Sequence, residues 1–180
     1  MNKKSKIMIG LLAVAAVLFC TIEFWIIPSN QAKQEAYAQN QTDALTHDIS
    51  VVQEYKTPYV GNATKVTGLF HVLPLQNVSM NFEIDSKACV LTVNYLDTVR
   101  NIGEEKVRRD VVYNSVAAMA AIDNLSGITY HFYDSSYSFT REQIEAIYGA
   151  SLSDLLDENN WRENVQDKVS DKEFVGQFFA

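Results

Sequence analysis

Residues 78–95 alternate between apolar and polar side chains, and this alternation constrains the fold more than any other feature of the chain. A period of two predicts β-strands with one dry and one wet face, and Asp85-Ser86-Lys87-Ala88 predicts the turn of a hairpin. The apolar positions are Val78, Met80, Phe82 and Ile84 in the first strand and Cys89, Leu91, Val93 and Tyr95 in the second.

The period changes after the hairpin. Apolar residues between Glu104 and Leu125 recur at helical spacing, which predicts an amphipathic helix with Lys106, Arg108 and Arg109 mostly on its outer face. We therefore expect an α+β domain of order ααββαβα: a three-stranded antiparallel sheet with helices on one face. The further expected elements are helices at 49–55, 63–72 and 140–148, the last opened by a capping box, and a third strand at 128–133.

The N-terminus carries three lysines followed by an apolar run over residues 7–27. At 1.5 Å per residue this run would form a helix of roughly 32 Å, the length that crosses a bilayer. The lysines predict a cytoplasmic N-terminus and an extracytoplasmic C-terminal part, attached to the cell membrane by a single transmembrane helix. The alternative is a signal peptide cleaved after Ala36-Tyr37-Ala38, which would release a secreted domain. Both alternatives export the domain.

These patterns divide the chain into five parts: a basic tail (1–6), a transmembrane helix (7–27), a hydrated stalk (28–47), the α+β domain (48–156) and an acidic tail (157–180). The tail is either a docked helix or a flexible end, because its apolar residues are only weakly periodic. Without residues 1–27, which hold three lysines and one glutamate, the net charge falls from −7 to −9. An acidic domain of this kind disfavours nucleic acid and anionic lipid as partners.

The residues that carry common chemistry are scattered. His47, His71 and His131 lie far apart in the sequence, and the two cysteines, Cys20 and Cys89, cannot meet in a disulfide. We therefore expect no metal and no cofactor. A Ser-His-Asp triad could draw on His131 and Asp134, but no nucleophile elbow accompanies them. We therefore expect a binding protein, and the alternatives are a small cell-envelope hydrolase and a structural envelope protein.

Two surfaces are candidate binding sites. If the apolar residues of the hairpin face the helices, a set of polar residues shares the opposite face of the sheet and could bind a partner. The alternative is that this is an ordinary solvated face of an antiparallel sheet. Tyr55 and Tyr59 flank a Pro-Gly turn at 56–62, where the alternative is a structural corner that packs tyrosines on the core. The polar set consists of Asn81, Glu83, Thr92, Asn94, Thr129, His131 and Tyr133.

Six short segments occur in a recognisable order and spacing: Tyr55–Asn62, Leu73-Pro74, Leu91–Tyr95, Ile128–Phe132, Thr140–Glu142 and Tyr148-Gly149. Together they resemble domain of unknown function family 4825 (DUF4825), over roughly residues 48–156. The resemblance implies an exported, single-pass or lipid-anchored protein of Gram-positive bacteria, with similar domains found on membrane sensors. The family offers no catalytic residues that could be carried over to this sequence. We expect an extracytoplasmic sensory or protein-interaction module whose partner is a membrane sensor or another envelope protein.

Overall fold

The computed structural model describes residues 3–179, which fall into two compact units, Met1–Gln39 and Asn40–Ala180. The described residues of the first unit, 3–39, are all helical. They comprise α1 (Lys3–Thr21), a π-helical turn η1 (Ile22–Ile26) and the beginning of α2 (Ile27–Asn40). The second unit holds the sheet and is the domain discussed below.

The prediction of a transmembrane helix at 7–27 is wrong, because no helix among residues 3–179 is long and apolar enough to cross a membrane. The apolar run does not form one regular α-helix. At Thr21 the bonding changes, and the N–H of Ile27 donates to the carbonyl of Ile22, five residues back. The part of the run within α1, residues 7–21, would span only about 22 Å.

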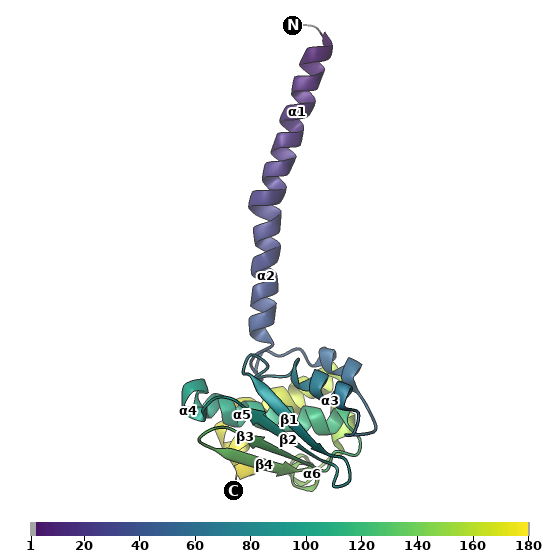
Figure 1. Ribbon diagram of the computed structural model, residues 1–180, viewed down its shortest axis with the longest axis vertical. Helices are drawn as coiled ribbons and strands as arrows, with labels where there is room; N and C mark the ends of the chain where they lie inside the picture. The colour runs from purple at the N-terminus through teal and green to yellow at the C-terminus, as the bar shows by residue number, and fades with distance from the viewer. Residues whose placement is uncertain (1–2, 180) are drawn as a thin grey trace. The chain divides into compact units, whose positions relative to one another are not determined.

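The domain is built on a four-stranded sheet in the order β1-β2-β3-β4, with strands β1 (Met80–Asp85), β2 (Val90–Tyr95), β3 (Gly127–His131) and β4 (Ser136–Thr140). The β1–β2 and β3–β4 pairs are antiparallel, whereas β2 and β3 are parallel. Figure 1 shows the sheet in front of α5 and of the yellow C-terminal segment, residues 158–179. The class is α+β, as predicted, but the sheet is mixed and not a three-stranded antiparallel one.

Two features explain this correction. Between β2 and β3 the chain passes through α4 (Val99–Ile102) and the eighteen-residue α5 (Glu104–Ala121), and such a crossover returns it to the end where β2 began. The fourth strand was missed because it is short and serine-rich. Apolar and polar residues do alternate in this strand: Tyr137 and Phe139 point inward, and Ser136, Ser138 and Thr140 are exposed.

The hairpin forms at the expected place with one difference. Asp85 Oδ1 accepts hydrogen bonds from the N–H groups of Lys87 and Ala88, which closes the turn. Cys89 belongs to this turn and not to the apolar face of β2, because its φ of 58° is left-handed. Leu91, Val93 and Tyr95 are buried, as the alternation predicts.

Helix α5 is the centre of the core. Thirteen of its eighteen residues are buried, so it lacks the broad solvated face that its amphipathic pattern predicts. On one side Ser115 Oγ lies 3.0 Å from the Tyr130 hydroxyl of β3. The other sides are covered by short elements: η2 (Ile49–Tyr55), α3 (Ala63–Phe70), η3 (Leu152–Leu155) and the C-terminal segment.

Residues 41–47, which we name the N-terminal strap, pack on α5. Gln41, Ala44 and His47 are buried there. The fully buried side chain of Asp110 on α5 accepts hydrogen bonds from the Ala44 N–H at 3.2 Å and from Lys106 Nζ at 2.6 Å. The last residues of the expected stalk are therefore part of the domain.

His47 secures the far end of the strap. Its Nε2 donates to the Val72 carbonyl at 2.8 Å, so Nδ1 accepts from the Tyr113 hydroxyl at 2.9 Å. Burial is the main cause that lowers the pKa of His47 from 6.5 to about 4, while the Val72 carbonyl and nearby Asp48 oppose the shift. The imidazole is therefore neutral at neutral pH.

Acidification is expected to destabilise the domain through His47. Since the unfolded chain binds the proton more tightly, stability is complete above pH 6.5 and falls as the pH drops toward 4. Between pH 7 and pH 5 the loss amounts to about 2 kcal/mol. Urea denaturation of wild type, His47→Gln and the exposed-site control His71→Gln at both pH values measures it. Equal pH dependence in all three proteins would contradict the assignment.

The C-terminal segment is docked and not a free tail. After α6 (Arg141–Tyr148) and η3, the chain returns to α5 and buries Trp161, Val165, Val169, Val175 and Phe178. Gln166 Nε2 donates to the carbonyls of Ala44 and His47, which joins the segment to the N-terminal strap. Its elements are α7 (Glu158–Trp161), η4 (Arg162–Gln166), η5 (Lys168–Ser170), α8 (Lys172–Gly176) and η6 (Gln177–Phe179).

Candidate functional site

The outward face of the sheet carries two rows of polar side chains that run across all four strands. Strand alternation turns these residues away from the core, and the register places one residue of every strand in each row. We name the eight residues the polar face. The first row is Asn81, Asn94, His131 and Ser136, and the second is Glu83, Thr92, Thr129 and Ser138.

Hydrogen bonds among the side chains hold seven of these eight residues in place. Asn94 Nδ2 donates to Asn81 Oδ1 at 2.9 Å and to Glu83 Oε1 at 3.0 Å, so both rows meet at Asn94. On the other half of the sheet, Thr129 Oγ1 lies 2.9 Å from Ser138 Oγ, and His131 Nδ1 lies 3.0 Å from Ser136 Oγ. The donors and acceptors are thus ordered on a rigid sheet before any partner arrives.

Four of the predicted binding residues, Asn81, Glu83, Asn94 and His131, come together in the polar face. Thr92 and Thr129 of the expected polar set join them, and Tyr133 does not. Ser136 and Ser138 were not foreseen, because the strand that carries them was missed. Tyr133 lies just beyond β3, where its N–H donates to the Asp97 carbonyl and its side chain is 71% exposed. It borders the His131 end of the polar face.

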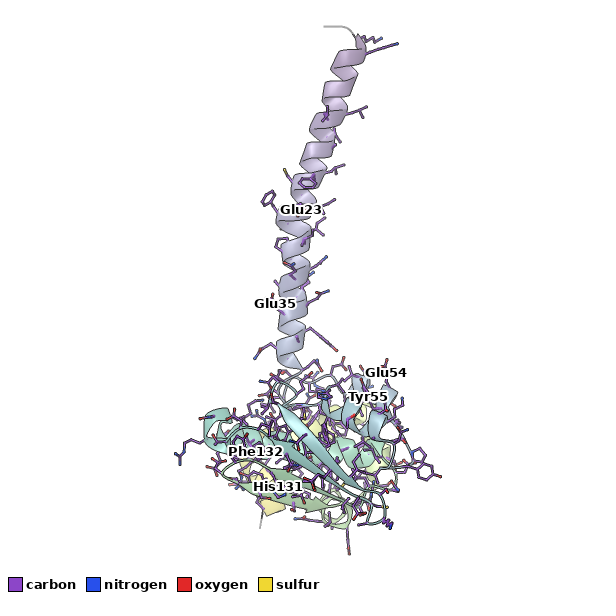
Figure 2. The ribbon with its side chains drawn as sticks, viewed as in Figure 1. Glu23, Glu35, Glu54, Tyr55, His131 and Phe132 are labelled. Carbon is purple, nitrogen blue, oxygen red and sulfur yellow. The ribbon has the colours of Figure 1, made fainter. Side chains whose placement is uncertain are left out.

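The predicted tyrosine site is not part of this surface. Tyr55 is half-buried, and a Cβ at Gly68 would lie 2.5 Å from its ring, so Tyr55 packs against α3. Tyr59 is 67% exposed. It lies in a turn that Asn124 stabilises, because Asn124 Oδ1 accepts a hydrogen bond from the Val60 N–H. Figure 2 shows Tyr55 and His131 in separate parts of the domain.

His131 and Asp134, the residues considered for a catalytic triad, do not hydrogen-bond to each other. Asp134 caps α4, because its two carboxylate oxygens accept hydrogen bonds from the N–H groups of Val99 and Arg100 at 2.7 and 3.3 Å. The partner of His131 Nδ1 is Ser136 and not a carboxylate. Within residues 3–179, no group of three or more His, Cys, Asp or Glu side chains is placed to hold a metal ion.

Comparison with known proteins gives one match. A family model described as "Domain of unknown function (DUF4825)" matches residues 52–142, which is half of the chain and includes all four strands. No curated protein and no solved structure shows a significant match.

Proposed function

The chain belongs to the DUF4825 family, whose description states no activity, so we propose from the geometry of this domain that it is a binding module. It recognises a protein or peptide partner through the polar face and acts by binding rather than turnover. The observation that carries the proposal is that seven of the eight side chains of the polar face are hydrogen-bonded to another side chain of that face, since polar side chains held in place lose little conformational entropy when a partner binds.

Electrostatics narrow the class of partner. Glu83 contributes a carboxylate to the polar face, and residues 28–180 carry a net charge of −9. Such a surface repels nucleic acid and anionic headgroups and attracts basic protein surfaces.

We further propose that the domain works outside the cytoplasm. The support is the basic N-terminus before an apolar run, the composition of an export signal. The first residue of the mature protein tests how the signal is processed, because a start at Gln39 would mean cleavage after Ala38.

A substitution in the middle of the polar face is expected to weaken partner binding. Thr129→Arg places a bulky cation between the two halves of the face and costs at least about tenfold in affinity. The matched control is Ser170→Arg, because Ser170 is also a hydroxyl residue with one hydrogen bond and lies on the C-terminal segment. Full-length wild type and both variants are immobilised and exposed to envelope extract, and the retained proteins are quantified. Failure of the wild type to retain a partner, or equal retention by Thr129→Arg, would refute the proposal.

A further inference from the structure

Strand β1 has a free edge. It pairs with β2 on one side, and no strand within residues 3–179 pairs with its other side. The Leu96 N–H donates to the Ser79 carbonyl at 2.8 Å, which sets the phase of the ladder. Asn81 and Glu83 therefore bond to β2, whereas Met80, Phe82 and Ile84 direct their N–H and C=O groups outward. This edge is a template for one more strand.

The inner side of the same edge is apolar and incompletely covered. Met80, Phe82 and Ile84 are each only half-buried, although their side chains point to the core side of the sheet. Phe82 packs on Phe70 at a centroid distance of 5.8 Å and on the exposed ring of His71 at 6.0 Å. Alternate side chains of an added strand would extend this apolar layer.

At the opposite edge of the sheet, the chain itself covers the apolar side of β4. On β4, Tyr137 and Phe139 both contact Phe179 of the C-terminal segment, each at a centroid distance of 5.5 Å. The Arg108 guanidinium carbon lies 3.9 Å from the centre of the Phe179 ring, so Phe179 contacts both α5 and β4. Of the two edges, β1 is the one whose apolar side lacks such a cover.

The outer side of the β1 edge is acidic. Glu83 and Asp85 project from it two residues apart, and Lys87 in the hairpin turn is the nearby basic residue. Asn94 orients the Glu83 carboxylate. A strand added beside β1 would place every second side chain next to these carboxylates, where lysine or arginine is favoured.

We propose that the β1 edge binds an extended peptide segment in which apolar and basic residues alternate, and that this segment becomes a fifth strand. The inference rests on the proposed function and names its partner class. The backbone of the peptide bonds to Met80, Phe82 and Ile84, its apolar side chains cover Phe82, and its basic side chains face Glu83. A second copy of this chain fits less well, because it would bring further Glu83 and Asp85 carboxylates to the same face.

The test uses the full chain and a synthetic peptide about nine residues long in which valine and lysine alternate. Amide hydrogen exchange is followed residue by residue with and without the peptide. The Phe82 and Ile84 amides are expected to exchange at least about tenfold more slowly when the peptide is bound. The Asn81 and Glu83 amides already bond to β2 and are expected to change little. Two control peptides, one with glutamate in place of lysine and one with valines and lysines in separate blocks, are expected not to bind.

Two variants probe the same edge. Ile84→Pro removes the outward N–H without removing a bond to β2, and Ile84→Ala removes the side chain but keeps that N–H. Ile84→Pro is expected to weaken peptide binding at least about tenfold, and Ile84→Ala less. Should the proline variant fail to fold, the exchange experiment on the wild type still decides.

Binding without protection of the Phe82 and Ile84 amides, or equal binding of a control peptide, would overturn the inference. Protection that rises with protein concentration in the absence of peptide would assign the edge to self-association and overturn it as well. The proposed function fails separately, because its test depends on Thr129 and on envelope extract. If Thr129→Arg abolished retention of a partner that does not protect the β1 amides, the polar face would remain the binding surface and only the inference about the β1 edge would fail.

Discussion

Replacing Trp161 with alanine is expected to destabilise the domain by about 3–5 kcal/mol. The indole is fully buried in the C-terminal segment and meets the ring of Tyr113 edge to face at 5.1 Å. Tyr113 also contacts His47, so the indole supports both the core helix α5 and the N-terminal strap. Its removal leaves a cavity at the junction of three segments.

Urea denaturation followed by near-ultraviolet circular dichroism measures this loss. The control is Trp25→Ala, since Trp25 is 76% exposed in the N-terminal unit and its removal is expected to leave the unfolding transition in place. Coinciding transitions for the two variants would show that the C-terminal segment contributes nothing to the stability of the domain.

Replacing Lys106 with methionine is expected to destabilise the domain by about 3 kcal/mol at neutral pH. Lys106 Nζ bonds to the buried Asp110 carboxylate at 2.6 Å, to the Thr42 carbonyl at 2.7 Å and to Asp43 at 3.2 Å. Arg109 would remain near Asp110, but its Nε lies 3.4 Å away and its Nη2 already binds Asp43. The substitution therefore leaves a buried carboxylate with poor compensation.

The pH dependence of this loss has a definite sign. Burial already raises the pKa of Asp110, against the lowering effect of Lys106 and Arg109, and removal of Lys106 raises it further. A folded-state pKa above the unfolded value favours the folded state as the carboxylate is protonated, so the destabilisation shrinks as the pH falls through the new pKa.

The control for this second prediction is Lys172→Met. Lys172 bonds to Glu105 at 2.8 Å, but the two side chains are 73% and 62% exposed, and exposed pairs contribute less than about 1 kcal/mol. Urea denaturation at several pH values compares both variants with the wild type. If Lys106→Met were as mild as Lys172→Met, the network around Asp110 would not anchor the N-terminal strap.

Local patterns predicted much of the secondary structure. The turn at Asp85, the caps of α6 at Thr140 and Gly149 and the start of α5 depend on neighbours in the sequence, and they form where expected. The capping box is only half formed. Thr140 Oγ1 accepts from the Gln143 N–H, but the Gln143 side chain turns to the C-terminal segment, where its Nε2 donates to the Phe178 carbonyl. A contact with a distant segment replaced the local one.

The sequence likewise predicted part of the candidate site, namely which side chains point away from the core. Alternation determines which side chains leave the core, so six of the eight polar-face residues followed from the sequence. Which strands lie side by side is a long-range property. The pairing of Asn94 with His131 required the parallel β2–β3 register, and Ser136 and Ser138 joined only because β4 pairs with β3.

The sequence by itself determined the two-faced strands, the helix between them and an acidic, polar outer surface, because these follow from residue periodicity and charge. Only the tertiary structure decided that the sheet is mixed, that the N-terminal strap and the C-terminal segment enclose α5, and that His47 is buried. The physical reason is that weakly periodic segments gain their stability from contacts with residues far away in the chain. His47, Asp110 and Trp161 meet partners up to 66 positions distant, and no local pattern encodes those meetings.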